Sequence, residues 1–307
     1  MNPLRIIFMG SPDFAVPSLE KLASSRHIIE AVVSNPDKRR GRGGRPLPTD
    51  VKRKAAELEL PVIDVEDPKS REFSNALKAI EPDLIVIVAF RILPQTILAI
   101  PKSGSINLHA SLLPKYRGAA PIHWAIINGE KETGCTTFFL DEKVDTGEII
   151  SQKKTVIGPD ETTGDLYNRL KILGADLLLE SVNEIACGTC EKMPQNDDLA
   201  TPAPKLFREN TRIKFGKNAA DVHNFIRGLY PFPLAWCTYS NEKVKIHHAA
   251  PYTGETLKPG QLDFRDGKLF AGCGTGSVEI IELQLPGKKR MTGADFVNSY
   301  GLSVPFK

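Results

Sequence analysis

Short apolar runs alternate with amphipathic segments over the first hundred residues. The run Leu84 to Phe90 is apolar at every position, which is typical of a strand covered by helices on both faces. Weaker β-rich runs precede it at Arg5 to Met9, Ile28 to Val33 and Pro61 to Asp64. The segments between these runs have helical composition, at residues 14–25, 49–60 and 70–80. This alternation predicts a doubly wound, Rossmann-like α/β domain with Leu84 to Phe90 at the centre of a parallel sheet.

Helix signals continue the pattern to residue 189. Ser11 and Pro12 are expected to cap and open the first helix, and Thr49 to cap the second. Farther along, a helix is expected around Pro121 to Asn128 and a long amphipathic one at Thr163 to Ala186. Two strands are predicted between them, at residues 135–140 and 147–151. We expect the first domain to span residues 1–189.

The pattern changes after residue 189. Residues 190–207 contain three prolines among polar residues, which favours an extended linker. From residue 208 to 307, a short helix at Ala219 to Arg227 is followed by β-rich pieces at residues 235–239, 244–248, 268–271 and 277–285. Gly and Pro turns separate these pieces, so the pattern predicts a smaller, OB-like β-barrel domain. Strand alternation would turn the adjacent His247 and His248 to opposite faces.

Composition is ordinary for a soluble protein. The chain has 307 residues, 41% hydrophobic and 25% charged, and that length favours two domains. The longest apolar run is far shorter than the roughly 20 residues that cross a bilayer, and the first residues do not resemble a signal peptide, so we expect a cytoplasmic protein. Five cysteines make an odd count, which speaks against a disulfide framework. Cys187 and Cys190 lack a second ligand pair, so free thiols are a better interpretation than a zinc site.

Positive charge gathers at two places although the net charge is only +3. Residues 208–307 carry fourteen Lys and Arg against nine Asp and Glu, a net of +5. The segment Ser34 to Thr49 has a local charge of +4, from Asp37 and five basic residues: Lys38, Arg39, Arg40, Arg42 and Arg45. Two basic features suggest a polyanionic partner, while a solvated surface loop explains the charge of the segment equally well.

Asn107 and His109 are the first candidate site residues. They alternate with apolar residues in Ser105 to His109, so a strand projects both from one face. The end of a strand in an open α/β sheet is where such sheets bind ligands, and an amide beside a cationic imidazole can stabilise an oxyanion. A polar strand end hydrogen-bonded to a loop is the equally plausible structural explanation.

Asp145 is the third candidate, in the turn-rich segment Asp141 to Gly147. Asp145 could be only a turn residue, but a carboxylate beside His109 would orient the ring and stabilise its charged form for proton donation. A metal site built from Asn107, His109 and Asp145 would have a single nitrogen ligand and is disfavoured. A serine hydrolase is disfavoured because the chain has no GxSxG motif.

The stretches Ile106 to Ile122 and Leu140 to Gly147 closely resemble the signature of the 10-formyltetrahydrofolate-dependent formyltransferases. Within that superfamily the chain is similar to the methionyl-tRNA formyltransferase family over nearly its whole length. The further matching segments are residues 8–15, 35–43, 227–236 and 286–291. The chain departs from the family at Ala89 to Pro94, which is one residue shorter and lacks a glycine, and at Ile213 to Phe215, where the family usually has Ile-Asp-Trp.

The resemblance implies formyl transfer from 10-formyltetrahydrofolate to methionyl initiator tRNA, by a monomer that needs no metal. It implies Asn107, His109 and Asp145 as the catalytic residues. It places folate contacts in two loops: Phe90, Arg91, Ile92, Leu93, Ser111, Leu112, Leu113 and Pro114. It makes the basic segment tRNA-binding, through Lys38, Arg39, Arg40, Arg42 and Arg45. The alternatives are a formyltransferase for a small amine, such as glycinamide ribonucleotide or an amino sugar, and an inactive RNA-binding protein.

Overall fold

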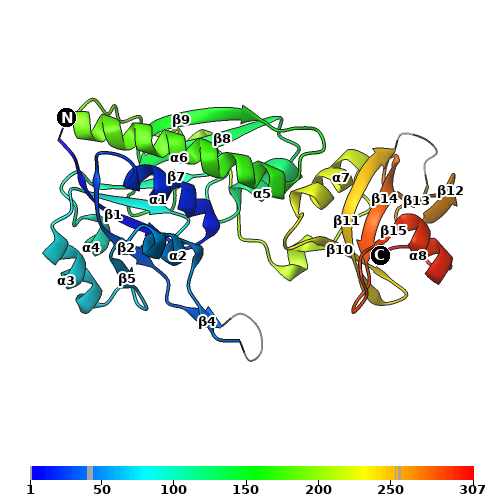
Figure 1. Cartoon of the computed structure of the whole chain (residues 1–307). Coiled ribbons are helices and arrows are strands. Elements are labelled where there is room, and N and C mark those ends of the chain that lie inside the picture. Colours follow the sequence, from blue (N-terminus) through cyan, green and yellow to red (C-terminus); the bar gives the residue numbers. More distant parts are fainter. Residues whose placement is uncertain (1, 40–43, 253, 255–256) are drawn as a thin grey trace. The chain divides into compact units, whose positions relative to one another are not determined.

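The computed structural model describes residues 2–39, 44–252, 254 and 257–307, and the chain forms two compact units (Figure 1). The first unit consists of Met1–Gly118, Thr133–Thr155 and Tyr167–Pro202. The second consists of Ala119–Glu132, Val156–Leu166 and Ala203–Lys307. The units therefore interleave along the chain, and the division into folding domains at 1–189, 190–207 and 208–307 stays a prediction.

A seven-stranded sheet forms the centre of the first unit, in the order β5-β2-β1-β6-β7-β8-β9. The strands are β1 (Arg5–Gly10), β2 (Ile28–Ser34), β5 (Val62–Asp64), β6 (Leu84–Val88), β7 (Ser105–His109), β8 (Glu132–Phe139) and β9 (Ile149–Val156). The first five are parallel and β8 is antiparallel to β7. Strand β6 is fully buried in the middle position, so the predicted α/β fold is confirmed.

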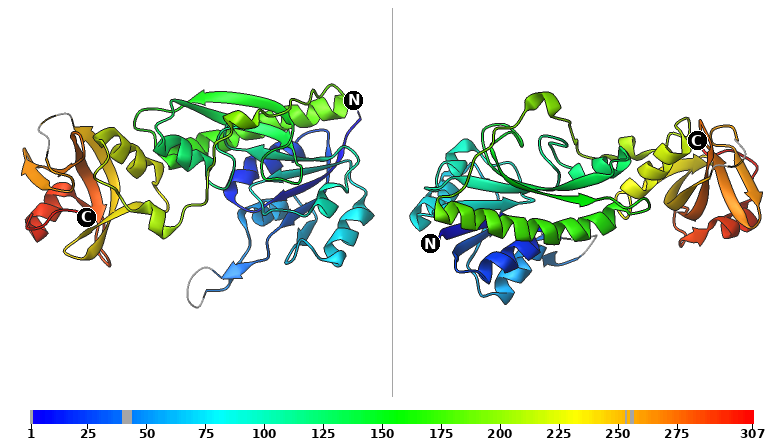
Figure 2. Two further views of the ribbon diagram at one scale, coloured as in Figure 1. Left: turned by 180° about the vertical axis from the view of Figure 1, so that it is seen from behind. Right: turned by 90° about the horizontal axis from the view of Figure 1, so that it is seen from above.

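Helices cover both faces of this sheet (Figure 2). Their bounds are α1 (Val16–Ala23), α2 (Asp50–Glu57), α3 (Arg71–Ile80), α4 (Gln95–Leu98) and α6 (Thr163–Cys187). On one face α3 and α4 share an apolar cluster with Ile7 and Ile87. On the other, α6 approaches so closely at Gly174 that an added Cβ would lie 2.8 Å from Leu108. No helix in the described ranges is long and apolar enough to span a membrane.

The helix caps follow the prediction at one of two positions. The Thr49 side chain accepts a hydrogen bond from the Lys52 amide at the start of α2, as predicted. The predicted Ser11 cap is wrong, because a short 3-10 turn (η1, Asp13–Ala15) comes first and α1 begins after it. The Ser11 hydroxyl instead accepts from the Asn35 side chain at 2.8 Å, which ties β1 to the end of β2.

The basic segment is a hairpin where a loop was expected. Strand β3 (Lys38–Arg39) pairs antiparallel with β4 (Pro46–Leu47). The base of the hairpin is closed by a 2.7 Å hydrogen bond between the hydroxyls of Ser34 and Thr49. Lys52 adds ion pairs to Asp37 and Asp64 there. The segment is therefore anchored at both ends.

The second unit contains an antiparallel sheet in the order β10-β11-β14-β13-β12, with β15 paired to β14. The strands are β10 (Ala235–Tyr239), β11 (Glu242–Tyr252), β12 (Leu262–Arg265), β13 (Lys268–Gly272), β14 (Ser277–Gln284) and β15 (Met291–Thr292). The helices are α5 (Pro121–Ile127), α7 (Ala219–Gly228) and α8 (Gly293–Tyr300), and a short 3-10 turn, η3 (Arg208–Thr211), precedes α7. Another 3-10 turn, η2 (Asp197–Leu199), lies in the predicted linker and belongs to the first unit. The predicted small β-rich domain is confirmed, although the sequence pattern missed β12 and β15.

The two adjacent histidines of β11 do not follow strand alternation. The ring of Tyr230 lies 6.2 Å from that of His247 and 4.3 Å from that of His248, measured between centroids. A β-bulge interrupts the register of β11 with β14 at this point, and a bulge adds one residue to one strand. The prediction of opposite faces is therefore wrong, because the extra residue breaks the period of two.

Candidate active site

Asn107 and His109 project from one face of β7 near its carboxyl end. The register pairs Asn107 with Ile87 of β6 and Phe138 of β8, and pairs His109 with Thr136. Leu108 points to the opposite face, against α6. The strand order reverses between β1 and β6, and open α/β sheets bind ligands outside the carboxyl ends of strands near such a reversal. The pair therefore lies at the edge where open α/β sheets of this kind generally bind ligands.

The His109 ring is held between a backbone carbonyl and a carboxylate. Its side chain is only 7% exposed, and Nε2 is 2.8 Å from the carbonyl oxygen of Tyr116. Because a carbonyl oxygen can only accept, Nε2 carries a proton and donates it to this bond. The other ring nitrogen, Nδ1, lies 3.7 Å from Oδ2 of Asp145. Nδ1 is therefore the ring nitrogen that faces the Asp145 carboxylate.

Asp145 lies in the connection between β8 and β9, in a tightly built turn. Its backbone has a φ of 58°, a left-handed conformation that Asp tolerates better than most residues. Its Oδ2 accepts a 2.8 Å hydrogen bond from the Gly118 amide. Two residues on, a Cβ at Gly147 would lie 1.7 Å from the Phe139 carbonyl oxygen, so only glycine fits there. The turn thus brings the carboxylate next to His109.

The loop after β7 contains four of the residues expected to contact folate. Ser111 and Leu113 are buried, and their polar atoms are used within the fold. The Ser111 hydroxyl donates to the Lys115 carbonyl oxygen at 2.7 Å, and the Leu113 amide donates to the Thr136 hydroxyl at 3.1 Å. Leu112 and Pro114 keep part of their surface exposed. The loop is therefore firmly attached to β8, and folate contact by these four residues stays a prediction.

The other four expected folate contacts follow β6. Phe90 and Leu93 pack against the core, whereas Ile92 is 77% exposed. The Arg91 guanidinium donates to the Glu66 carbonyl oxygen at 2.8 Å and to the Asn35 side chain. These bonds fix the segment against the ends of β2 and β5, at the same edge as Asn107. Ile92 is the one apolar side chain of this group left largely free to meet a ligand.

The basic residues of the hairpin are solvent-exposed where the structure describes them. Lys38 and Arg39 form β3, and Arg45 directly precedes β4. The predicted contacts Arg40 and Arg42 lie outside the described residues. The hairpin follows the carboxyl end of β2, so it leaves the sheet at the edge where Asn107 and His109 lie. Its role in binding tRNA stays a prediction.

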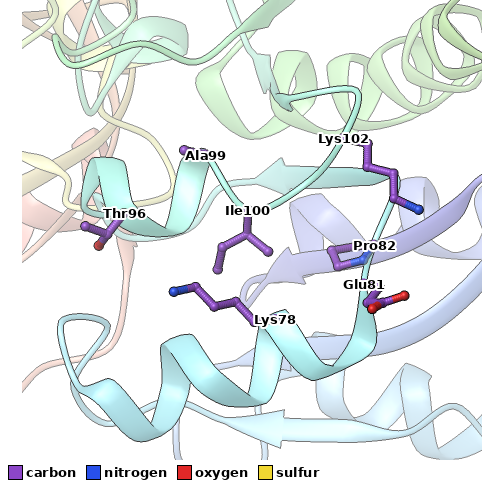
Figure 3. A pocket seen from close by; sticks show the side chains of 7 residues that line it. All are labelled: Lys78, Glu81, Pro82, Thr96, Ala99, Ile100 and Lys102. Carbon is purple, nitrogen blue, oxygen red and sulfur yellow. The ribbon is translucent and has the colours of Figure 1, made fainter.

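A surface pocket lies at the opposite edge of the sheet (Figure 3). It is lined by the end of α3, by α4 and by the residues just before β6 and β7: Lys78, Glu81, Pro82, Thr96, Ala99, Ile100 and Lys102. Since β6 and β7 run away from this edge, the pocket is at the far end of the strand that carries Asn107 and His109. Among the described residues, no cluster of three His, Cys, Asp or Glu side chains is placed to hold a metal ion.

Sequence reasoning missed two residues that support the Asp145 turn. Gln195 donates its side-chain amide to the Asp145 and Gly147 carbonyl oxygens. Arg117 in turn donates to the side-chain oxygen of Gln195. Arg117 lies inside the recognised stretch Ile106 to Ile122, but Gln195 is one polar residue in a polar linker. No periodicity or spacing in the sequence distinguishes it.

Comparison with known proteins identifies the family of the chain. Residues 4–182 match the family described as formyl transferase, and residues 205–301 match the formyl transferase C-terminal domain. A methionyl-tRNA formyltransferase of Chlorobium limicola is 45% identical over 306 residues, covering 97% of this chain and 96% of the relative. One of Pelotomaculum thermopropionicum is 44% identical, covering 96% of this chain and 95% of the relative.

A solved structure extends the likeness to the fold. An N-formyltransferase from Helicobacter canadensis, in complex with folinic acid and dTDP-3-aminofucose, has a TM-score of 0.69 at 24% identity. The alignment covers 90% of this chain and 98% of that one. At this identity the likeness shows a shared fold, while the family matches and the full-length relatives are more specific. The chain belongs to the formyl transferase family, and within it to the methionyl-tRNA formyltransferases.

Proposed function

We propose that this chain transfers the formyl group of 10-formyltetrahydrofolate to the free amino group of methionyl initiator tRNA, giving N-formylmethionyl-tRNA for translation initiation. The observation that carries the proposal is the 45% identity to a methionyl-tRNA formyltransferase over nearly the full length of both chains. The placement of Asn107 and His109 on one strand face, with Asp145 beside His109, supports it. We further propose that the reaction takes place in the cytoplasm.

In the proposed reaction, the neutral amine of methionine attacks the formyl carbon and the carbonyl oxygen becomes an oxyanion. Asn107 and the cationic ring of His109 donate hydrogen bonds to that oxygen. Because Nε2 of His109 is engaged by Tyr116, Nδ1 is the donor. The Asp145 carboxylate, 3.7 Å from Nδ1, stabilises the positive charge of the ring. Collapse of the intermediate breaks the bond to N10 of tetrahydrofolate, and that nitrogen takes up the proton released by the amine.

Substrate binding is assigned to separate surfaces. We propose that the loops at residues 90–93 and 111–114 hold the folate, with exposed Ile92 against its apolar surface. The exposed side chains of Lys38, Arg39 and Arg45 would meet tRNA phosphates, together with Arg40 and Arg42 of the same segment. These assignments explain why the hairpin is basic, whereas a small-amine substrate would leave its charge unexplained.

A formylation assay with two acceptors tests the proposal. The purified protein is incubated with 10-formyltetrahydrofolate and either charged initiator tRNA or a small amine, such as glycinamide ribonucleotide or a dTDP-amino sugar. We expect formylmethionyl-tRNA to form and the small amines to remain unmodified. Formylation of a small amine, with charged tRNA left unmodified, would replace the proposal by its alternative.

A further inference from the structure

One linker side chain holds the turn that carries Asp145. Nε2 of Gln195 lies 3.0 Å from the Asp145 carbonyl oxygen and 2.8 Å from that of Gly147, so it donates to both. Oε1 of Gln195 accepts from Nε of Arg117 at 3.1 Å and from its Nη2 at 2.7 Å. Carbonyl oxygens only accept and a guanidinium only donates, so these partners fix the orientation of the amide. Both N–H groups of Nε2 and the Oε1 atom of Gln195 are therefore hydrogen-bonded within the protein.

Arg117 lies between the two residues that hold His109 and Asp145. The Tyr116 carbonyl oxygen accepts from His109, and the Gly118 amide donates to the Asp145 carboxylate at 2.8 Å. The Arg117 side chain, 14% exposed, reaches past this backbone to Gln195. These hydrogen bonds form a closed circuit, because the Gly118 amide bonds Asp145 and Gln195 bonds both Asp145 and Arg117. His109 joins the circuit through the Tyr116 carbonyl oxygen.

This circuit stabilises a backbone conformation that is intrinsically unfavourable. Asp145 has a φ of 58°, a conformation that still costs free energy for Asp, although less than for most residues other than glycine. Gln195 bonds the carbonyl groups on both sides of the turn, at residues 145 and 147. Without these bonds, the turn would depend on fewer contacts, such as that of the Gly118 amide, and the carboxylate would be held less firmly beside Nδ1 of His109.

We propose that Gln195 and Arg117 are positioning residues, which set the location of the Asp145 carboxylate relative to His109 without touching the substrates. The inference rests on the proposed formyl transfer for its kinetic consequence. The competing role for Arg117 is direct phosphate binding. Two of its guanidinium nitrogens, Nε and Nη2, are already engaged by Gln195, and Nη2 also pairs with the Asp197 carboxylate at 2.7 Å, so the positive charge is already balanced by an anion of the protein.

Gln195→Glu is the sharpest test. The variant keeps the shape of the side chain and an oxygen for Arg117, but it places a second oxygen where Nε2 donated to two carbonyl groups. We expect kcat for formylation of charged tRNA to fall about tenfold to a hundredfold, with KM for tRNA within about twofold of wild type. Gln195→Ala should behave alike. Asn75→Ala is the matched control, because this exposed amide on α3 lies outside the hydrogen-bonded group and should leave kcat unchanged.

Two further measurements make the result decisive. In an Asp145→Asn background, Gln195→Glu should lower kcat by less than about twofold, since both changes act on the same group. Amide hydrogen exchange measures the hydrogen-bonded circuit independently of catalysis. The Gly118 amide should exchange about tenfold faster in Gln195→Glu than in wild type or Asn75→Ala. Wild-type kcat in Gln195→Glu, an effect confined to KM for tRNA, or unchanged Gly118 exchange would each overturn the inference. A wild-type protein that leaves charged tRNA unmodified would overturn the proposed function, while the exchange measurement would still decide on the circuit.

Discussion

At the scale of single residues, the site separates into side chains proposed to contact the substrates and groups that hold those side chains in place. Asn107 and His109 face the carboxyl edge of the sheet, and their placement follows from strand alternation, which can be read from the sequence. The partners of His109 cannot be read in this way. Tyr116 and Asp145 reach the ring through loop conformations with positive φ at both residues, and such conformations depend on tertiary contacts.

Asn107→Ala and His109→Ala should each lower turnover far more than tRNA affinity. Their hydrogen bonds to the reacting oxygen form mainly in the transition state, so removing one donor should cost about a hundredfold or more in kcat. Steady-state kinetics with charged tRNA measure the effect. Asn75→Ala, at an exposed asparagine of α3, is the matched control and should keep wild-type kinetics. Near-normal kcat in both site variants would remove the pair from the catalytic role.

At the scale of elements, hydrophobic periodicity predicts the helices and strands that bury a regular apolar face. It fails where the backbone departs from regular geometry. The long helix α6 and the buried strand β6 appear nearly as expected, because their apolar patterns are sustained. The bulge in β11 was invisible, since one extra residue leaves no mark in composition. The hairpin β3–β4 was missed for a related reason, because its four strand residues have no apolar alternation and are held by Lys52 and Thr49 at its base.

Gly147→Ala should be strongly destabilising. The new methyl group would lie 1.7 Å from the Phe139 carbonyl oxygen, so the backbone of the β8–β9 turn must move. We expect a loss of at least about 2 kcal/mol in the free energy of unfolding, with lower kcat because Asp145 moves too. Chemical denaturation measures the first effect. Gly216→Ala is the control, since no atom lies within 4 Å of its added Cβ, and equal stability of the two variants would contradict the prediction.

Buried histidines should make the fold sensitive to acid, and His223 of α7 is the best placed to show it. Burial, and then the charge of Arg227, lower the pKa of His223, while Asp160 opposes the shift. The unfolded chain, with an ordinary pKa of about 6.5, then binds the proton first as the pH falls. Stability is therefore complete above pH 6.5 and declines below it, by at most about 1.4 kcal/mol per pH unit for this group, until the pKa of the folded state is passed.

Denaturation of wild type and His223→Gln at several pH values measures this contribution. We expect the variant to lose less stability between pH 7.5 and 5.5, whatever its stability at neutral pH. His27, His123 and His247 also have lowered pKa values, so the wild-type slope does not vanish in the variant. Parallel slopes for the two proteins would show that His223 does not contribute.

At the scale of the whole molecule, charge is placed on specific elements although the net charge is small. The described basic residues of the hairpin, Lys38, Arg39 and Arg45, are all exposed. Exposed charged side chains contribute little to stability, so removing them should affect binding and leave the fold intact. Replacing all three with alanine should raise KM for charged tRNA, leave KM for 10-formyltetrahydrofolate unchanged, and flatten the salt dependence by up to roughly one counterion per lost phosphate contact.

A second triple variant controls for the change in net charge. Arg26, Lys78 and Lys102 are exposed basic residues of the same unit, and the last two line the pocket at the opposite sheet edge (Figure 3). Replacing them with alanine removes the same charge away from the proposed path of the tRNA. If both triple variants change KM and salt dependence equally, the effect is one of overall charge and the hairpin is an ordinary surface feature.

The interleaving of the two units has a consequence for how the protein is made. Helix α5 belongs to the second unit, and α7, which packs so closely on it that a Cβ at Gly228 would meet Ile127, begins about 90 residues later. At roughly 5 to 20 residues synthesised per second, the apolar face of α5 stays uncovered for about 5 to 20 seconds before the ribosome has made α7. The first unit is likewise interrupted before its strand β8. The nascent chain therefore exposes apolar surface until its last third emerges, and a chain truncated at residue 202 would keep that surface exposed permanently.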